Sequence, residues 1–171
     1  MSFTKSNFLE ILKQHERILF KVSNAYCEDP EDRKDLVQEM IIQLWSSKHK
    51  YNAEFKFSTW IYRIALNVAI SHYRKVSKRK FTHVDINEHL INISDQSSEN
   101  NELDHNLETL QKFISELDKL NKALILLYLE NYNYKEISEV LGITNTNVAT
   151  KINRIKKRLK NRFENQVTHK N

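Results

Sequence analysis

Four polar or basic side chains near the C-terminus are the residues best suited to recognise another molecule by hydrogen bonding. They recur at steps of three and four: Asn147, Thr150, Lys151 and Arg154. Residues at this spacing lie on one face of a helix. Amide, hydroxyl, ammonium and guanidinium groups can all donate hydrogen bonds to base edges or phosphates. The spacing therefore predicts a helix face that contacts nucleic acid.

The residues around this face indicate how it is presented. The other side of the same helix is apolar, with Val148, Ile152, Ile155 and Leu159. A short amphipathic helix comes before it, with Ile137, Val140 and Leu141. Between the two, Gly142 suits a left-handed helix end, and Thr144 or Asn145 can cap the second helix. This arrangement predicts a helix-turn-helix; the alternative is an ordinary helical hairpin with a charged exterior.

Basic residues are concentrated toward the end of the second helix. Residues 151–162 contain seven Lys or Arg and no acid, so we expect this helix end to follow a phosphate backbone. Upstream, the segment LDKLNKALILLYLEN predicts a further helix, with Leu117, Leu120, Leu124 and Leu127 on one face.

A second candidate surface lies on a helix that begins near Asp29 and Pro30. Asp29 can cap it, and Pro30 suits its first position. Its apolar stripe consists of Leu36, Met40, Ile41, Leu44 and Trp45. Other parts of its surface carry Asp35, Gln38, Glu39 and Ile42. An earlier amphipathic helix is predicted over 7–27, with Phe8, Ile11, Leu12, Leu19 and Val22 at helical spacing.

A third helix, predicted from about 58 to about 75, carries the third candidate surface. Its core face is formed by Trp60, Ile61, Ile64, Ala65 and Val68. Another face carries Arg63, Asn67, Ile70 and Arg74, with Tyr62 and Tyr73 nearby. Cationic groups bind phosphates and exposed aromatic rings stack on unpaired bases, so this face suits single-stranded nucleic acid. The alternative is a solvated amphipathic helix whose Tyr and Trp residues pack in the core.

Residue counts argue against catalysis and metal binding. The chain has 1 Gly and 1 Cys, which excludes glycine-rich phosphate loops, nucleophile elbows, internal disulfides and cysteine-based zinc sites. The 7 His residues have no metal-motif spacing: His15, His49, His72, His83, His89, His105 and His169. We therefore expect no enzyme activity, no cofactor and no metal, and we expect Cys27 to be a buried thiol in a reducing compartment.

Charge divides the chain into three blocks. Residues 1–80 carry 15 basic and 9 acidic residues, residues 81–111 carry 7 acidic and no basic residues, and residues 112–171 carry 12 basic and 6 acidic residues. The middle block lacks sustained helical periodicity and predicts a flexible acidic linker. We therefore predict an all-α fold of two small helical domains, 1–80 and 112–171, joined by the linker 81–111. The alternative is one domain with an acidic loop.

The hydropathy pattern predicts a cytoplasmic protein. The longest unbroken apolar run is 123–129, far shorter than a membrane span. The N-terminal segment has acidic residues inside its apolar stretch and lacks the features of a secretory signal.

Three segments together resemble the extracytoplasmic-function group of bacterial RNA polymerase sigma factors. They are DLVQEMIIQLW at 35–45, FSTWIYRIALNVAISHYRK at 57–75 and YKEISEVLGITNTNVATKINRIKKRLK at 134–160. The resemblance implies that 1–80 is a region-two domain, which binds core polymerase and melts the minus-ten element. It also implies that 112–171 is a region-four domain, which reads the minus-thirty-five element as duplex.

The resemblance also implies roles for single residues. The expected core-polymerase contacts are Asp35, Gln38, Glu39 and Ile42. The expected residues for binding and melting minus-ten DNA are Trp60, Arg63, Asn67 and Arg74, with the segment 46–57 before them. The expected readers in the helix-turn-helix are Asn147, Thr150, Lys151 and Arg154. The implied partners are core RNA polymerase, promoter DNA as duplex and melted single strand, and an anti-sigma protein of a kind that is often membrane-anchored.

One part of the recognition helix departs from the resemblance. Many members have a Gly-Thr-Val-Lys series where this chain has Thr146, Asn147, Val148 and Ala149. Ala149 loses one candidate phosphate contact, so the promoter consensus of other members does not carry over. A second hypothesis is an autonomous helix-turn-helix regulator that binds duplex DNA without polymerase, but it gives no role to DLVQEMIIQLW.

Overall fold

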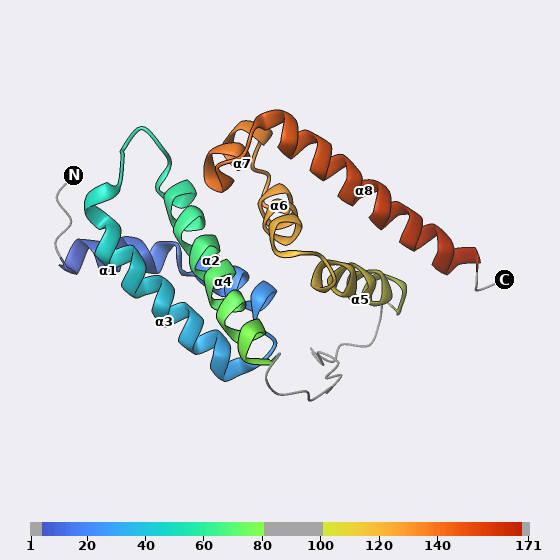
Figure 1. The fold of residues 1–171 in the computed structure, drawn as a ribbon, viewed down its shortest axis with the longest axis horizontal. Coiled ribbons are helices and arrows are strands. Elements are labelled where there is room, and N and C mark those ends of the chain that lie inside the picture. The colour runs from blue at the N-terminus through green and yellow to red at the C-terminus, as the bar shows by residue number, and fades with distance from the viewer. Residues whose placement is uncertain (1–4, 81–100, 169–171) are drawn as a thin grey trace. The chain divides into compact units, whose positions relative to one another are not determined.

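The computed structural model describes residues 5–80 and 101–168, and all regular structure in these two ranges is helical. The helices form two groups, which belong to two compact units, Met1–Ile91 and Asn92–Asn171 (Figure 1). The predicted all-α fold with two helical groups is confirmed. Most of the predicted linker, 81–100, lies outside the described residues, and the exact domain boundaries stay a prediction.

The N-terminal group contains four α-helices and a short 3₁₀ helix within 5–80. They are α1 (Lys5–Gln14), α2 (Glu16–Tyr26), α3 (Pro30–Ser47), η1 (Lys48–Lys50) and α4 (Phe57–Lys80). In Figure 1, α3 and α4 lie side by side, and α2 packs against both. The core consists of fully buried apolar side chains, among them Leu19, Val22, Leu36, Met40, Leu44, Ile61 and Ala65.

The single early helix predicted over 7–27 is wrong, because the chain turns at His15. The backbone of this residue has φ −116° and ψ 9°, outside the helical region. The amide of His15 donates to Leu12 O at 3.0 Å, and the amide of Ile18 donates to His15 O at 3.0 Å. The His15 ring lies 5.6 Å from the Phe57 ring at the start of α4. Tight turns therefore separate α1 from α2, and His15 contacts a residue far away in the sequence. Helical periodicity depends on near neighbours, so it could not predict this break.

The start of α3 follows the sequence prediction. Asp29 caps the helix, since its Oδ1 accepts from the amides of Glu31 at 2.8 Å and Asp32 at 3.1 Å. Arg33 ties down the preceding loop by donating to Cys27 O at 2.9 Å. The thiol of Cys27 is buried, as predicted, and burial raises its pKa.

The C-terminal group also contains four α-helices in the described residues. They are α5 (Asn101–Ser115), α6 (Lys119–Leu129), α7 (Tyr134–Leu141) and α8 (Asn145–Thr168). Its core is built from α6, α7 and α8, with Leu124, Leu127, Ile137, Val148 and Ile152 fully buried or nearly so.

Helix α5 corrects the prediction for 101–111, which we expected to belong to the flexible linker. This part is helical because Thr109 and Phe113 are buried in the group, and α5 packs against α6 and α8. Many of the residues around these two positions are polar, so the sequence does not show the apolar spacing of an amphipathic helix clearly. The next helix also begins later than predicted: Asp118 caps α6, accepting from the amides of Leu120 and Asn121. Leu117 is therefore a buried residue of the connection.

None of the helices described is both long and apolar enough to cross a membrane. Within the described ranges, no group of His, Cys, Asp and Glu side chains is arranged to hold a metal ion.

Candidate nucleic-acid and protein interfaces

The turn between α7 and α8 fixes the direction in which α8 leaves. Gly142 has φ 66° and ψ 32°, the left-handed conformation. Its amide and that of Ile143 both donate to Ser138 O, at 2.9 and 3.3 Å. The hydroxyl of Thr144 then caps α8 by accepting from the amide of Asn147 at 3.2 Å. The glycine turn is confirmed, and of the two proposed caps Thr144 makes the side-chain bond.

Helix α8 holds the four predicted readers together on its exposed side, which we call the reading face (Asn147, Thr150, Lys151 and Arg154). Asn147, Thr150 and Arg154 are exposed, and Lys151 is half-buried. Val148, Ile152 and Ile155 are buried on the opposite side. The Thr150 hydroxyl donates to Thr146 O at 2.9 Å, so without a ligand it bonds to its own helix.

Sequence reasoning missed one polar residue on this exposed side, Asn153. Its side chain is exposed next to Arg154, and its amide can pair with an adenine edge as Asn147 can. Its position in the sequence could have revealed it, because Asn153 lies three residues after Thr150, just as Thr150 lies three residues after Asn147.

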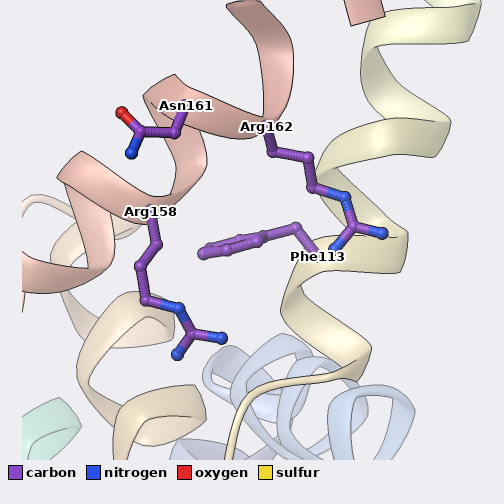
Figure 2. A pocket seen from close by; sticks show the side chains of 4 residues that line it. All are labelled: Phe113, Arg158, Asn161 and Arg162. Carbon is purple, nitrogen blue, oxygen red and sulfur yellow. The ribbon is translucent and has the colours of Figure 1, made fainter. Parts of the chain in front are cut away.

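The basic end of α8 is partly engaged within its own domain (Figure 2). Arg162 forms a two-pronged ion pair with Glu116, and its second nitrogen lies 2.8 Å from Glu116 Oε1. Arg158 lies 5.9 Å from the Phe113 ring, and the four residues Phe113, Arg158, Asn161 and Arg162 line an open hollow. Lys156 lies 3.4 Å from the Tyr128 hydroxyl. Arg162 is therefore paired with Glu116, just after the end of α5, and the expectation that this helix end follows a phosphate backbone stays a prediction.

The ion pair shifts the pKa of both partners so that each keeps its charge more strongly. The hydrogen bond from Arg162 lowers the pKa of the Glu116 carboxyl, and Glu116 raises the pKa of Arg162 in return. Both side chains are partly exposed, at 29% for Arg162 and 46% for Glu116, so solvent screens the attraction.

The N-terminal group presents a mixed polar and apolar surface on α3, which we call the α3 face (Asp35, Gln38, Glu39 and Ile42). Asp35 and Gln38 are exposed, and Glu39 is half-buried. Ile42 is 65% exposed, a large aliphatic side chain with most of its surface in water. The Glu39 carboxylate reaches α4, where its Oε2 lies 3.3 Å from His72 Nδ1.

An aromatic cluster stands at the start of α4. The Trp60 ring lies 5.5 Å from Tyr51 and 5.2 Å from Phe57. Trp60 is half-buried, so part of its ring packs inside the domain and part is exposed to solvent. In the preceding loop Phe55 is 42% exposed, and the Tyr51 hydroxyl donates to Phe55 O at 3.0 Å.

The remaining residues predicted on α4 divide by exposure. Arg63 and Asn67 are exposed, and with Trp60 they form what we call the α4 face. Tyr62 is only 2% exposed, whereas Tyr73 is 42% exposed. The suggestion that Tyr62 stacks on bases is therefore wrong, because its ring is part of the core. The side chain of Arg74, also predicted here, lies outside the described residues.

Comparison with known families finds two matches in one chain. The family described as Sigma-70 region 2 matches residues 11–79, and the family described as Sigma-70, region 4 matches residues 107–159. The first match spans α2, α3 and α4, and the second spans α6, α7 and the reading face.

Curated relatives are similar over most of their length. The ECF RNA polymerase sigma factor SigM of Bacillus subtilis is 29% identical over 155 residues, covering 88% of this chain and 91% of the relative. The RNA polymerase sigma factor YlaC of the same organism is 30% identical over 132 residues, covering 76% of each chain.

Two solved structures share the fold. The sigma factor RpoE of Bartonella quintana, in complex with the anti-sigma factor NepR, has a TM-score of 0.74 at 17% identity and covers 92% of this chain and 97% of its own. CnrH, in complex with the cytosolic domain of CnrY, has a TM-score of 0.65 at 17% identity and covers 94% and 90%.

Proposed function

This chain belongs to the sigma-70 family, in its extracytoplasmic-function group, and we propose how its exposed faces divide the work. As a sigma factor it binds RNA polymerase and directs transcription initiation, and it has no catalytic role of its own. The observation that carries this function is the presence of regions 2 and 4 in one chain, in that order. The assignment of residues to polymerase and to DNA rests on the exposure and chemistry described above.

The α3 face is proposed to contact core RNA polymerase. Protein interfaces combine an apolar centre with a polar rim, and the α3 face offers both kinds of side chain, the exposed Ile42 and the exposed Asp35 and Gln38. We expect Ile42→Ala to weaken binding to core polymerase by roughly tenfold. Leu9→Ala is the matched control, because Leu9 is also an exposed aliphatic residue of this group. Equal losses for both variants would contradict the assignment.

The α4 face and the aromatic cluster are proposed to hold the melted minus-ten strand. Arg63 offers a guanidinium group to the backbone, and the half-buried Trp60 offers a ring edge or face to an unpaired base. We expect Arg63→Ala to reduce the permanganate reactivity of promoter thymines in the polymerase complex. Arg17→Ala, an exposed arginine on α2, should leave that reactivity unchanged. The corresponding role of Arg74 is proposed from the family resemblance alone.

The reading face is proposed to enter the major groove at the minus-thirty-five element. Asn147 and Arg154 are exposed and carry amide and guanidinium groups that can pair with base edges, and Thr150 and Lys151 complete the face. Asn147→Ala should relax the preference at one base pair by about 1–3 kcal/mol. Lys157→Ala should instead weaken binding to all sequences alike, because an exposed ammonium contacts phosphate without reading bases.

The autonomous regulator stays the alternative, and one experiment separates it from the proposal. Run-off transcription with core polymerase on a promoter library should show start sites only when this protein is added. Tight duplex binding without polymerase, together with no stable complex with core enzyme, would favour the alternative. The same experiment also gives the promoter sequence that this chain prefers.

A cytoplasmic anti-sigma complex is proposed by analogy with the two solved relatives. Both structures are of complexes, RpoE with the anti-sigma factor NepR and CnrH with the cytosolic domain of CnrY. We propose that this chain acts in the cytoplasm and is restrained by an anti-sigma protein, membrane-anchored in the cell, which covers the α3 face. Pull-down of the tagged chain from membrane and soluble fractions tests this, and Ile42→Ala should weaken the capture.

A further inference from the structure

His72 of α4 makes a contact with the α3 face that its sequence neighbourhood does not predict. Its Nδ1 lies 3.3 Å from Glu39 Oε2, although the two residues are far apart in the chain. We propose that His72 is a positioning residue for core-polymerase binding, which holds the Glu39 carboxylate in place on the α3 face. This proposal rests on the proposed role of Glu39 as a polymerase contact.

The His72 ring is mostly buried, and the chemistry of the Glu39 carboxylate decides which partner donates in their contact. The His72 side chain is 20% exposed, and its Nε2 is buried without a hydrogen-bond partner among the described residues. An ionised carboxylate only accepts hydrogen bonds, so the imidazole nitrogen must be the donor in this contact. Nδ1 therefore carries a proton in this contact and donates it to Glu39 Oε2.

This arrangement is poorly explained by stability alone. An imidazole nitrogen buried without a partner destabilises the fold relative to an apolar ring of the same shape. Among the described residues, the polar contact of the ring is with a carboxylate whose side chain is 43% exposed, where a hydrogen bond stabilises a fold only weakly. The contact is therefore better explained by its effect on the conformation of Glu39 than by any stabilisation of the core.

Holding Glu39 prepares it for a partner. A glutamate side chain on a helix surface loses rotamer freedom when it binds, and this loss lowers the affinity of an interface. His72 restricts that freedom beforehand by engaging Oε2. A carboxylate has acceptor capacity on both oxygens, so the exposed part of Glu39 can still accept from a polymerase side chain. The contact also links the polymerase-binding helix to α4, which carries the proposed promoter-melting residues.

Two substitutions of His72 separate the hydrogen bond from the ring. His72→Phe keeps the shape and removes the donor, and it should weaken the binding of the full-length protein to core polymerase roughly two- to tenfold. His72→Asn places an amide donor near the Nδ1 position and should restore affinity to within about twofold of the original. Tryptophan-fluorescence melting should show His72→Phe to be at least as stable as the original, so a folding defect would not account for the loss.

Repeating the His72→Phe measurement in a Glu39→Ala variant tests whether His72 acts through Glu39. There His72→Phe should have less than about a twofold effect, since the residue through which it acts is gone. Unchanged binding by His72→Phe, or an equal loss with and without Glu39, overturns the positioning role. If Glu39→Ala itself leaves the affinity unchanged, the proposed polymerase contact of Glu39 fails, and the role of His72 fails with it.

Discussion

Replacing Gly142 tests the turn on which DNA reading depends. Its φ of 66° lies where side chains are disfavoured, yet a Cβ built there meets no atom within 4 Å. The cost of Gly142→Ala is therefore conformational, about 1–2 kcal/mol. Gly142→Val should cost more, because a β-branched residue is rarely found in this region. Gly142→Asn is the matched control, since asparagine tolerates it and this chain already holds Asn131 at φ 61°.

The chain allows the effect to be assigned to one domain. Both tryptophans, Trp45 and Trp60, lie in the N-terminal group, so tryptophan fluorescence reports on that group and circular dichroism reports on both. For a domain of this size, Gly142→Ala should lower the C-terminal melting temperature by roughly 4–16 °C. The tryptophan transition should not move. Gly142→Val should also impair run-off transcription from a promoter that requires its minus-thirty-five element, while binding to core polymerase is kept.

The test depends on the order of the C-terminal melting temperatures of the three Gly142 variants. We expect the melting temperature to fall least for Asn, further for Ala and most for Val. Equal melting temperatures for all three, or a shift of the tryptophan transition alone, would refute the assignment of this glycine to a left-handed helix end. Normal activity of Gly142→Val on the promoter described above would show that the turn has been placed wrongly.

Three further predictions concern caps and charge. Asn131→Ala should destabilise the C-terminal group by about 1–2 kcal/mol, because alanine is disfavoured at the positive φ that asparagine tolerates; an unmoved circular-dichroism melting temperature would contradict this. Asp29→Ala removes the cap of α3 and should destabilise the N-terminal group by about 1 kcal/mol, and an unmoved tryptophan transition would argue against the cap. The pKa of Glu116 is lowered by Arg162, so the pair stabilises fully above the ordinary pKa of a glutamate and this stabilisation is lost as pH falls through the lowered value. Glu116→Gln should therefore reduce slightly the drop in C-terminal melting temperature between about pH 6 and pH 3; an unchanged drop would count against the pair.

Local chemistry in the sequence was enough to predict much of the C-terminal group. Gly142 marked the turn, and Thr144 was one of two candidate caps. The apolar stripe of α8 was correct at its fully buried positions, Val148 and Ile152. These features depend on residues within one or two helical turns of each other, so spacing alone reveals them. The four residues of the reading face share the exposed side of α8 for the same reason, and their role in reading DNA stays a prediction.

Contacts between distant residues were decided only by the tertiary structure. Packing made 101–111 helical by burying Thr109, and it placed the Tyr62 ring in the core. It also joined Glu39 to His72, and Arg162 to Glu116. Hydrophobic periodicity in the sequence does not predict these contacts, because each one depends on how two different helices pack against each other. The sequence by itself determined where α3, α7 and α8 begin and which sides of these helices are apolar, because capping and periodicity are local. Packing between helices decided which polar side chains stay at the surface and which are held by a distant neighbour.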